Sequence, residues 1–250
     1  NVINMIIGSD IQFYRSLDST NAYASQCLKA SDLQEGTVIC TDYQTAGKGH
    51  QGNRWESEEG KNLLFSIILY PSSISPDKQF FISMALSLGI YDFFRNLLPE
   101  VKIKWPNDIY VRNDKIAGIL IENSVIGETI ESCIAGIGIN INQEKFSPVI
   151  PNPVSLKMIT GKDSDTRICL KEILDYLDTR YKQLLYGNRD LISDEYMSSL
   201  YRYGEWHTYR SEGKTFKGII KGISETGSLR IEREDNSVSE FSFKEVDYIN

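Results

Sequence analysis

Hydrophobic positions in the first two thirds of the chain alternate between strand-like and helix-like patterns. Residues 63–70 form a continuous apolar run that ends at Pro71, which is typical of a strand buried on both faces. Ser75 and Pro76 predict the start of a long amphipathic helix, which must end by Pro99. Further strands are predicted at residues 37–41, 101–105, 109–122 (a hairpin turning at Asn113-Asp114) and 130–141. Together these elements predict an α/β or α+β domain in which helices flank a mixed sheet.

The pattern becomes helical from Thr166, a candidate N-cap, to about Leu200. Beyond residue 203 the chain consists of short apolar runs separated by glycine, predicted as strands at residues 215–220, 228–231 and 237–243. Strands this short and regularly spaced predict a small SH3-like barrel. We therefore expect a larger catalytic domain, residues 1–203, and a C-terminal domain, residues 204–250.

Composition lowers the odds of several classes of function. The 250 residues include 27 basic and 34 acidic side chains, a formal net charge of −7, whereas a general nucleic-acid binder needs a basic face. No apolar run reaches the roughly 18 residues of a membrane span. The four cysteines are widely spaced and form no C-x-x-C pair. We therefore expect reduced thiols in a cytoplasmic protein, without a zinc site.

Residues 43–55 are the first segment with candidate chemistry. Glycines at positions 47, 49 and 52 allow sharp turns and can present backbone N–H groups to an anion. Charge and a flat aromatic face come from Lys48, His50, Arg54 and Trp55. The alternative is a flexible surface loop whose tryptophan fills the core, and the loop by itself supports both interpretations about equally. The G-x-x-x-x-G-K-[ST] order of a P-loop is absent.

Residues 104–108, KWPND, are a sharper signal. The strand before them alternates apolar and basic residues, so its lysines share one face. Asn107 and Asp108 follow Pro106 at the strand's end, where open α/β sheets often bind ligands. They could hydrogen-bond a base or hold a metal-bound phosphate. A plain Asn-Asp turn is the alternative, and is favoured when the segment is taken alone.

Two further segments add a lysine and a glycine-bearing strand. Lys115 stands at the mouth of an apolar strand, where it can neutralise carboxylate and phosphate charge in a transition state. A solvated turn lysine is the alternative. Gly136 and Gly138 alternate along the strand that leads to Asn140, which permits close approach of a ligand or another backbone. A β-bulge is the alternative there.

The order of these segments resembles the biotin protein ligases across residues 13–145. Ser19-Thr20-Asn21 comes first, followed by the glycine-basic loop, KWPND, DKIAGIL and GIGININ. The resemblance is to the short form, the biotin–[acetyl-CoA-carboxylase] ligases without an N-terminal DNA-binding domain. It implies an α+β fold like that of class II aminoacyl-tRNA synthetases, with a mixed sheet flanked by helices and a small C-terminal SH3-like barrel. It also implies ATP and Mg²⁺, which form biotinyl-5′-adenylate before biotin passes to a lysine of a biotin carboxyl carrier domain of an acyl-CoA carboxylase.

The resemblance implies a role for each matching residue. The biotin-binding residues would be Ser19, Thr20, Asn21, Gln44, Gly47, Lys48, Lys115 and Gly118. The ATP-binding residues would be His50, Gln51, Arg54, Trp55, Lys104, Asn107, Asp108, Lys115 and Asn140. The catalytic residues would be Lys115, Asp108 and Lys48. Lys115 would bridge the biotin carboxylate and the α-phosphate, and we hypothesise that Asp108 positions or deprotonates the incoming amine. No side chains are assigned to a resident metal.

Two departures from the family pattern affect the expected affinity for the nucleotide. The loop carries Lys48, His50, Gln51 and Asn53 where the family commonly has more arginine, and each lost charge-assisted contact could cost about 1.5–3 kcal/mol. No basic residue that could reach the nucleotide is evident near the C-terminus. A lipoate or octanoate ligase or transferase and a non-catalytic biotin-sensing module stay as alternatives. A homodimer is left open.

Overall fold

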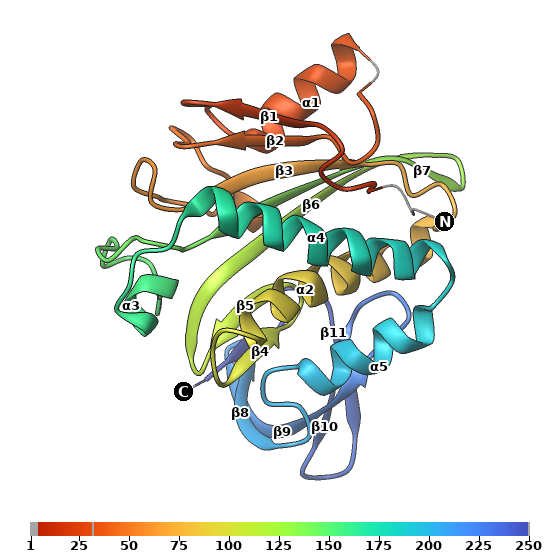
Figure 1. The fold of residues 1–250 in the computed structure, drawn as a ribbon. Helices are drawn as coiled ribbons and strands as arrows, with labels where there is room; N and C mark the ends of the chain where they lie inside the picture. Colours follow the sequence, from red (N-terminus) through yellow and green to blue (C-terminus); the bar gives the residue numbers. More distant parts are fainter. Residues whose placement is uncertain (1–4, 32, 250) are drawn as a thin grey trace.

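A seven-stranded mixed sheet forms the centre of the computed structural model, which describes residues 5–31 and 33–249 (Figure 1). The strand order is β1-β2-β3-β7-β6-β5-β4, with β1 and β2 parallel and the other neighbours antiparallel. The strands are β1 Ile11–Tyr14, β2 Val38–Thr41, β3 Leu63–Leu69, β4 Val101–Lys104, β5 Asp108–Val111, β6 Asp114–Ile126 and β7 Thr129–Ile139. The predicted mixed sheet is confirmed, and β1, which the pattern did not predict, forms one edge.

Helices cover both faces of this sheet. α2 (Phe80–Arg95) and α4 (Thr166–Leu185) run side by side across one face (Figure 1), where side chains such as Phe65 of β3 enter the main core. α1 (Thr20–Ala30) lies on the opposite face and packs Ala24 into a smaller apolar cluster. Both faces of β3 are therefore buried, as its continuous apolar run predicted. The remaining helices are α3 Leu156–Thr160 and α5 Arg189–Ser199.

Several element boundaries differ from the predicted ones. Pro76 starts a short 3-10 turn, Pro76–Lys78, before α2 begins. Asp165, rather than Thr166, caps α4, because its carboxylate accepts two N–H groups of the first turn. The β5–β6 turn lies one residue earlier than predicted, at Arg112 and Asn113, with Arg112 at a φ of 56°.

A separate five-stranded antiparallel sheet ends the chain, with the order β11-β10-β9-β8-β12. Its strands are β8 Trp206–Ser211, β9 Lys214–Ile223, β10 Leu229–Arg233, β11 Val238–Phe241 and β12 Asp247–Tyr248. The three predicted strands are present, and β8 and β12 are additional. Within the described part of the chain β11 and β12 are the two edges and do not pair, so the sheet does not close into a hydrogen-bonded barrel. Across residues 5–31 and 33–249 no helix is both long and apolar enough to cross a membrane.

Candidate active site

Polar side chains at the start of α1 form one connected group with β3 and the following loop. Ser19 caps the helix and accepts an N–H of its first turn at 3.5 Å. The Thr20 N–H donates to the Gln44 side-chain oxygen at 2.8 Å. Ser66 Oγ of β3 lies 2.7 Å from Thr20 Oγ1 and 2.6 Å from Asn21 Oδ1. The structure therefore brings together the four polar side chains that the family resemblance assigns to biotin binding: Ser19, Thr20, Asn21 and Gln44.

Two glycines of β7 leave room for large side chains on this face of the sheet. A Cβ atom at Gly136 would overlap the Asn21 amide, and one at Gly138 would overlap the Trp55 indole. Both glycines belong to a regular stretch of antiparallel pairing with β3. The alternating glycines are therefore not a β-bulge; they permit close approach by the chain's own side chains.

The glycine-basic loop folds back on itself. Lys48 and Arg54 pair as an isolated antiparallel bridge, and the Trp55 N–H donates to the Gly47 carbonyl at 3.0 Å. A single 3-10 turn, His50–Gly52, connects the two arms. This arrangement holds both basic residues near the end of the loop that carries the tryptophan.

The loop and β6 enclose a hollow of about 440 Å³. Gly47, Lys48 and Arg54 line it from the loop, and Leu120 and Glu122 line it from the strand. The side chain of Gln51, which the sequence placed on the nucleotide, lies outside the described part of the structure. A hollow of this volume lies within the range typical of small-molecule sites.

Lys115 and Asp108 meet at the end of the same sheet face. Lys115 Nζ lies 2.7 Å from Asp108 Oδ1, and the two side chains are 30% and 29% exposed, so a ligand can reach both. The β5–β6 register shifts after Ile109, and Asp108 stands opposite Gly118. A Cβ atom at Gly118 would come within 3.1 Å of Lys115 Nζ, so the glycine gives the lysine its room. The amine also lies 5.7 Å from the Trp55 ring centroid.

Asn107 and Asn140, which the resemblance assigns to ATP binding, both hydrogen-bond to backbone carbonyls beside the site. The Asn107 side-chain N–H donates to the Ile119 carbonyl at 2.9 Å, and that of Asn140 donates to the Val154 carbonyl at 3.1 Å. The Asn140 side-chain oxygen is buried and has no donor among the described residues. Such an oxygen costs free energy unless water or a ligand meets it. Its hydrogen bonding is therefore incomplete within the described part of the protein.

Lys104 extends toward tyrosines rather than toward the loop. Its amine donates to the Tyr110 hydroxyl at 3.1 Å and lies 4.9 Å from the ring centroids of both Tyr110 and Tyr248. Burial lowers the pKa of Lys104, while the nearby Asp108 carboxylate opposes this shift. Lys104 thus joins the β4–β5 hairpin to the last strand of the C-terminal sheet.

The C-terminal sheet also contacts the site through residues that the sequence did not single out. The Trp105 indole N–H donates to the Gly227 carbonyl at 2.9 Å, and the Phe243 ring centroid lies 4.0 Å from that of His50. Burial lowers the pKa of His50, and the positive charge of Lys244 lowers it further. Lys244 is thus a basic residue near the C-terminus that acts on the loop. No motif marks it, because its charge comes near His50 only in the folded protein.

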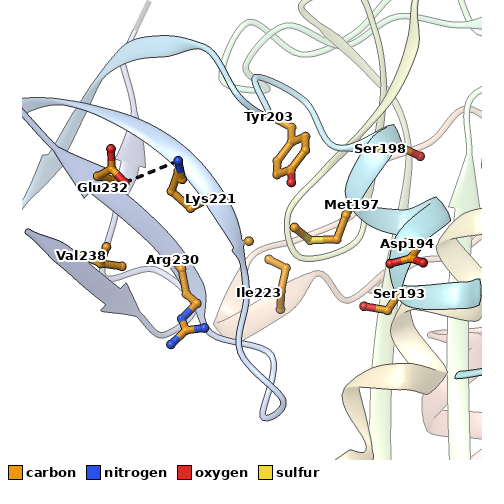
Figure 2. A pocket seen from close by; sticks show the side chains of 11 residues that line it. Ser193, Asp194, Met197, Ser198, Tyr203, Lys221, Ile223, Arg230, Glu232 and Val238 are labelled. Atoms are coloured by element: carbon orange, nitrogen blue, oxygen red, sulfur yellow. Dashed lines mark ion pairs between the residues drawn. The ribbon is translucent and has the colours of Figure 1, made fainter. Parts of the chain in front are cut away.

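A larger hollow, of about 700 Å³, lies between α5 and the C-terminal sheet (Figure 2). Met197 and Tyr203 border it on one side, and on the sheet side Lys221 pairs with Glu232 at 3.5 Å. None of the residues that the sequence placed on biotin or ATP lines it. We therefore place the candidate active site at the smaller hollow and the Lys115–Asp108 pair.

This fold and site define an acid-activating class of ligase. Lys48 and Arg54 line a hollow whose other wall is β6, and the partly exposed Lys115–Asp108 ion pair joins the same strand to β5, so cationic groups are available to offset carboxylate and phosphate charge. Residues 13–140, just over half of the chain, match the sequence profile of the Biotin/lipoate A/B protein ligase family. The chain belongs to this family.

Ligases are among the relatives and solved structures that the chain resembles. It is 29% identical to the biotin–[acetyl-CoA-carboxylase] ligase of Paracoccus denitrificans, over 85% of this chain and 90% of that protein. It is also 29% identical to the bifunctional ligase/repressor BirA of Bacillus subtilis (strain 168), over 92% of this chain and 71% of that protein. Biotin protein ligase from Aquifex aeolicus, solved in complex with biotin and ATP, superposes with a TM-score of 0.80 at 27% identity. That match covers 97% of this chain and 99% of the other.

Proposed function

We propose that the chain is an ATP-dependent biotin–protein ligase that acts on the biotin carboxyl carrier domain of an acyl-CoA carboxylase. The observation that carries this proposal is the Lys115–Asp108 pair at the end of a sheet face whose hollow is lined by the glycine-basic loop. Similarity to biotin ligases over nearly the whole chain supports biotin rather than lipoate as the acid.

In the first step the biotin carboxylate attacks the α-phosphorus of ATP. A P–O bond forms to the carboxylate oxygen, the bond to the β-phosphate oxygen breaks, and pyrophosphate leaves. Lys115 lies between the two anionic groups, so its charge offsets the repulsion between them and the charge that builds at the phosphorus. Lys48 and Arg54 line the hollow beside β6 and add positive charge at the ligand's other side.

In the second step the ε-amine of the carrier lysine attacks the carbonyl of the mixed anhydride, an amide bond forms, and AMP leaves. The amine must arrive without its extra proton to act as a nucleophile. Asp108 is the carboxylate nearest to Lys115, and its side chain is partly exposed. We assign to it the positioning of the incoming amine and the acceptance of its proton.

The donor set suits a magnesium ion that arrives with ATP rather than a resident metal. In the described part of the chain no group of three or more His, Cys, Asp or Glu side chains converges. Mg²⁺ on nucleotides is commonly held by phosphates and water with one or two protein oxygens. The partly exposed Asp108 carboxylate offers an oxygen of this kind. When bound, the ion would neutralise phosphate charge.

Three further expectations belong to the same proposal. Residues 204–250 would form a C-terminal unit that supports the site through Trp105 and His50. A cytoplasmic location is supported by four cysteines that are free thiols. A homodimer stays an open expectation.

Isotope exchange between pyrophosphate and ATP tests the proposed first step. We expect exchange that depends on biotin and is absent with lipoate or octanoate in its place. Exchange that depends on lipoate or octanoate would show that the chain is a lipoate or octanoate ligase instead. Biotin binding without any exchange would indicate a biotin-sensing module.

A further inference from the structure

Glu122 of β6 is an acidic side chain that lines the 440 Å³ hollow, opposite Lys48 and Arg54. Both substrates of the proposed first step are anions, and a carboxylate in their site repels them. The two basic residues have an evident use there, whereas the acid does not. A negative side chain in a site for anions needs another explanation, because the two charges repel each other.

The amide group of Asn21 determines which groups donate and which accept in the hydrogen bonds next to Glu122. Ser66 Oγ lies within hydrogen-bond distance of Asn21 Oδ1 and Thr20 Oγ1, at 2.6 and 2.7 Å, and it has one proton to give. The Asn21 amide oxygen can only accept, so Ser66 gives its proton to Asn21. The opposite amide orientation would place the Asn21 oxygen against two acceptors, the Leu120 carbonyl and the Glu122 carboxylate.

All hydrogen-bonding groups of the Asn21 side chain are therefore used within the protein. Its oxygen accepts from Ser66, and its amide nitrogen donates to the Leu120 carbonyl at 3.3 Å and to Glu122 Oε2 at 2.7 Å. Gly136 leaves the space that this amide occupies. Asn21 thus holds Glu122 in place and has no N–H left for a ligand. Glu122 Oε1 has no partner among the described residues and stays free to accept.

We propose that Glu122 is a specificity residue, whose carboxylate accepts an N–H of the ligand's ring and so selects a cyclic urea. This inference rests on the proposed function and adds the basis of its ring selectivity. An ionised carboxylate offers acceptors only, so its matching ligand must carry donors. The ureido ring of biotin has two N–H groups, whereas a dithiolane ring has none. Glu122 is exposed to solvent, so a ring that covers it displaces its water, and a ring without a donor then leaves the carboxylate unpaired.

The position of Glu122 also accounts for the separation of charges along the site. Lys115 and Asp108 lie at the end of β5 and β6 where the acid is activated, and Glu122 lies on β6 farther from this end. The negative charge thus faces the uncharged ring rather than the carboxylate. The ligand can bind in one orientation only, because its ring N–H groups need an acceptor such as Glu122 and its carboxylate needs a cation such as Lys115.

The experiment compares biotin with its two cyclic carbamate analogues, in each of which one ring N–H is replaced by oxygen. Dissociation constants are measured for the wild type, Glu122→Leu, Glu122→Gln and the control Glu131→Gln. Glu131 is an exposed acid of the same hairpin that does not line the hollow. For one of the two analogues, we expect wild type and control to prefer biotin by about 10- to 100-fold, the loss typical of a charge-assisted hydrogen bond.

In Glu122→Leu this preference should fall to near unity, with a higher KM for biotin and little change in kcat. Glu122→Gln keeps the shape and one acceptor oxygen, so it should give an intermediate preference and tests the idea even if the leucine variant fails to fold. Equal weakening of biotin and both analogues would show a purely structural role and overturn the inference. An unchanged preference in both variants would do the same. Wild-type protein without biotin-dependent exchange would instead contradict the proposed function itself.

Discussion

The Lys115 amine and the Asp108 carboxylate form an ion pair of 2.7 Å across β5 and β6, at a site where both side chains stay partly exposed. Without substrate the lysine is neutralised by this aspartate. A substrate carboxylate and an α-phosphate would compete for the same amine, so binding should loosen the pair and free Asp108 for the second step. One contact thus links the two halves of the proposed reaction.

Replacement of Lys115 by methionine should remove most of the adenylation activity. The variant keeps the length of the side chain but removes the charge that offsets carboxylate–phosphate repulsion. Loss of one such electrostatic contact lowers kcat by about 10²- to 10³-fold. Pyrophosphate exchange measures the effect, and Lys162→Met, a change at an exposed lysine, serves as the control. Exchange within a few-fold of wild type would show that Lys115 is not the activating group.

Asp108→Asn should slow transfer of biotin from preformed adenylate to the carrier lysine. The amide keeps the size of the side chain but is a much weaker base, and general base catalysis contributes about 10²- to 10⁴-fold. Single-turnover transfer isolates this step from adenylation. Asp163→Asn, at an exposed aspartate that pairs with Lys157, is the matched control. An unchanged transfer rate in Asp108→Asn would remove the aspartate from this role.

Gly138→Ala should destabilise the fold through its contact with Trp55. The added Cβ overlaps the indole, and overpacking of this kind costs about 1–3 kcal/mol. In a Trp55→Ala background the same glycine substitution should cost much less, because the overlapping atoms are gone. Free energies of unfolding of the two single variants and the double variant, from urea titration, measure the coupling. Additive effects would mean that Gly138 does not accommodate the tryptophan.

His50 should make the packing of the loop depend on pH. Burial lowers the pKa of His50 below its ordinary 6.5, Lys244 lowers it further, and Asp108 opposes the shift. The released loop therefore takes up a proton at a higher pH than the packed loop does. Packing is fully stabilised above 6.5 and weakens as the pH falls from 6.5 toward the lowered pKa. Proteolysis of the loop should therefore be constant above pH 6.5 and should rise as the pH falls below 6.5. A His50→Phe variant should lose this dependence, and a persisting one would assign it to another group.

The sequence predicted the parts of the fold that have strong local signals. The apolar run of β3 and the proline before α2 fixed a buried strand and a long helix, and both are present. Among the elements that were missed, two have a clear physical reason: α1 buries little more than Ala24 and polar residues, and β1 is a short edge strand. Neither produces a clear hydrophobic period. The spacing of glycines predicted strands in the last fifty residues but could not show whether the sheet closes.

The site was predictable only where the residues form a motif. Lys115 and Asp108 stand in short ordered segments that the sequence singled out, and the structure pairs their side chains. Lys104 belongs to the same KWPND segment, yet its amine extends to Tyr110 and Tyr248, because a one-dimensional pattern does not show which partner packs above a strand. Lys244 influences the pKa of His50 through its charge, an effect that no sequence motif marks.

Complete carrier labelling tests the central claim most directly. Purified protein is incubated with biotin, MgATP and a biotin carboxyl carrier domain, and the mass of the carrier is measured. We expect one biotin per carrier, attached through an amide to a single lysine, and a product that depends on ATP and is lost with Lys115→Met. A carrier that stays unmodified by the wild-type protein, although biotin is bound, would contradict the assignment of this site to a biotin–protein ligase.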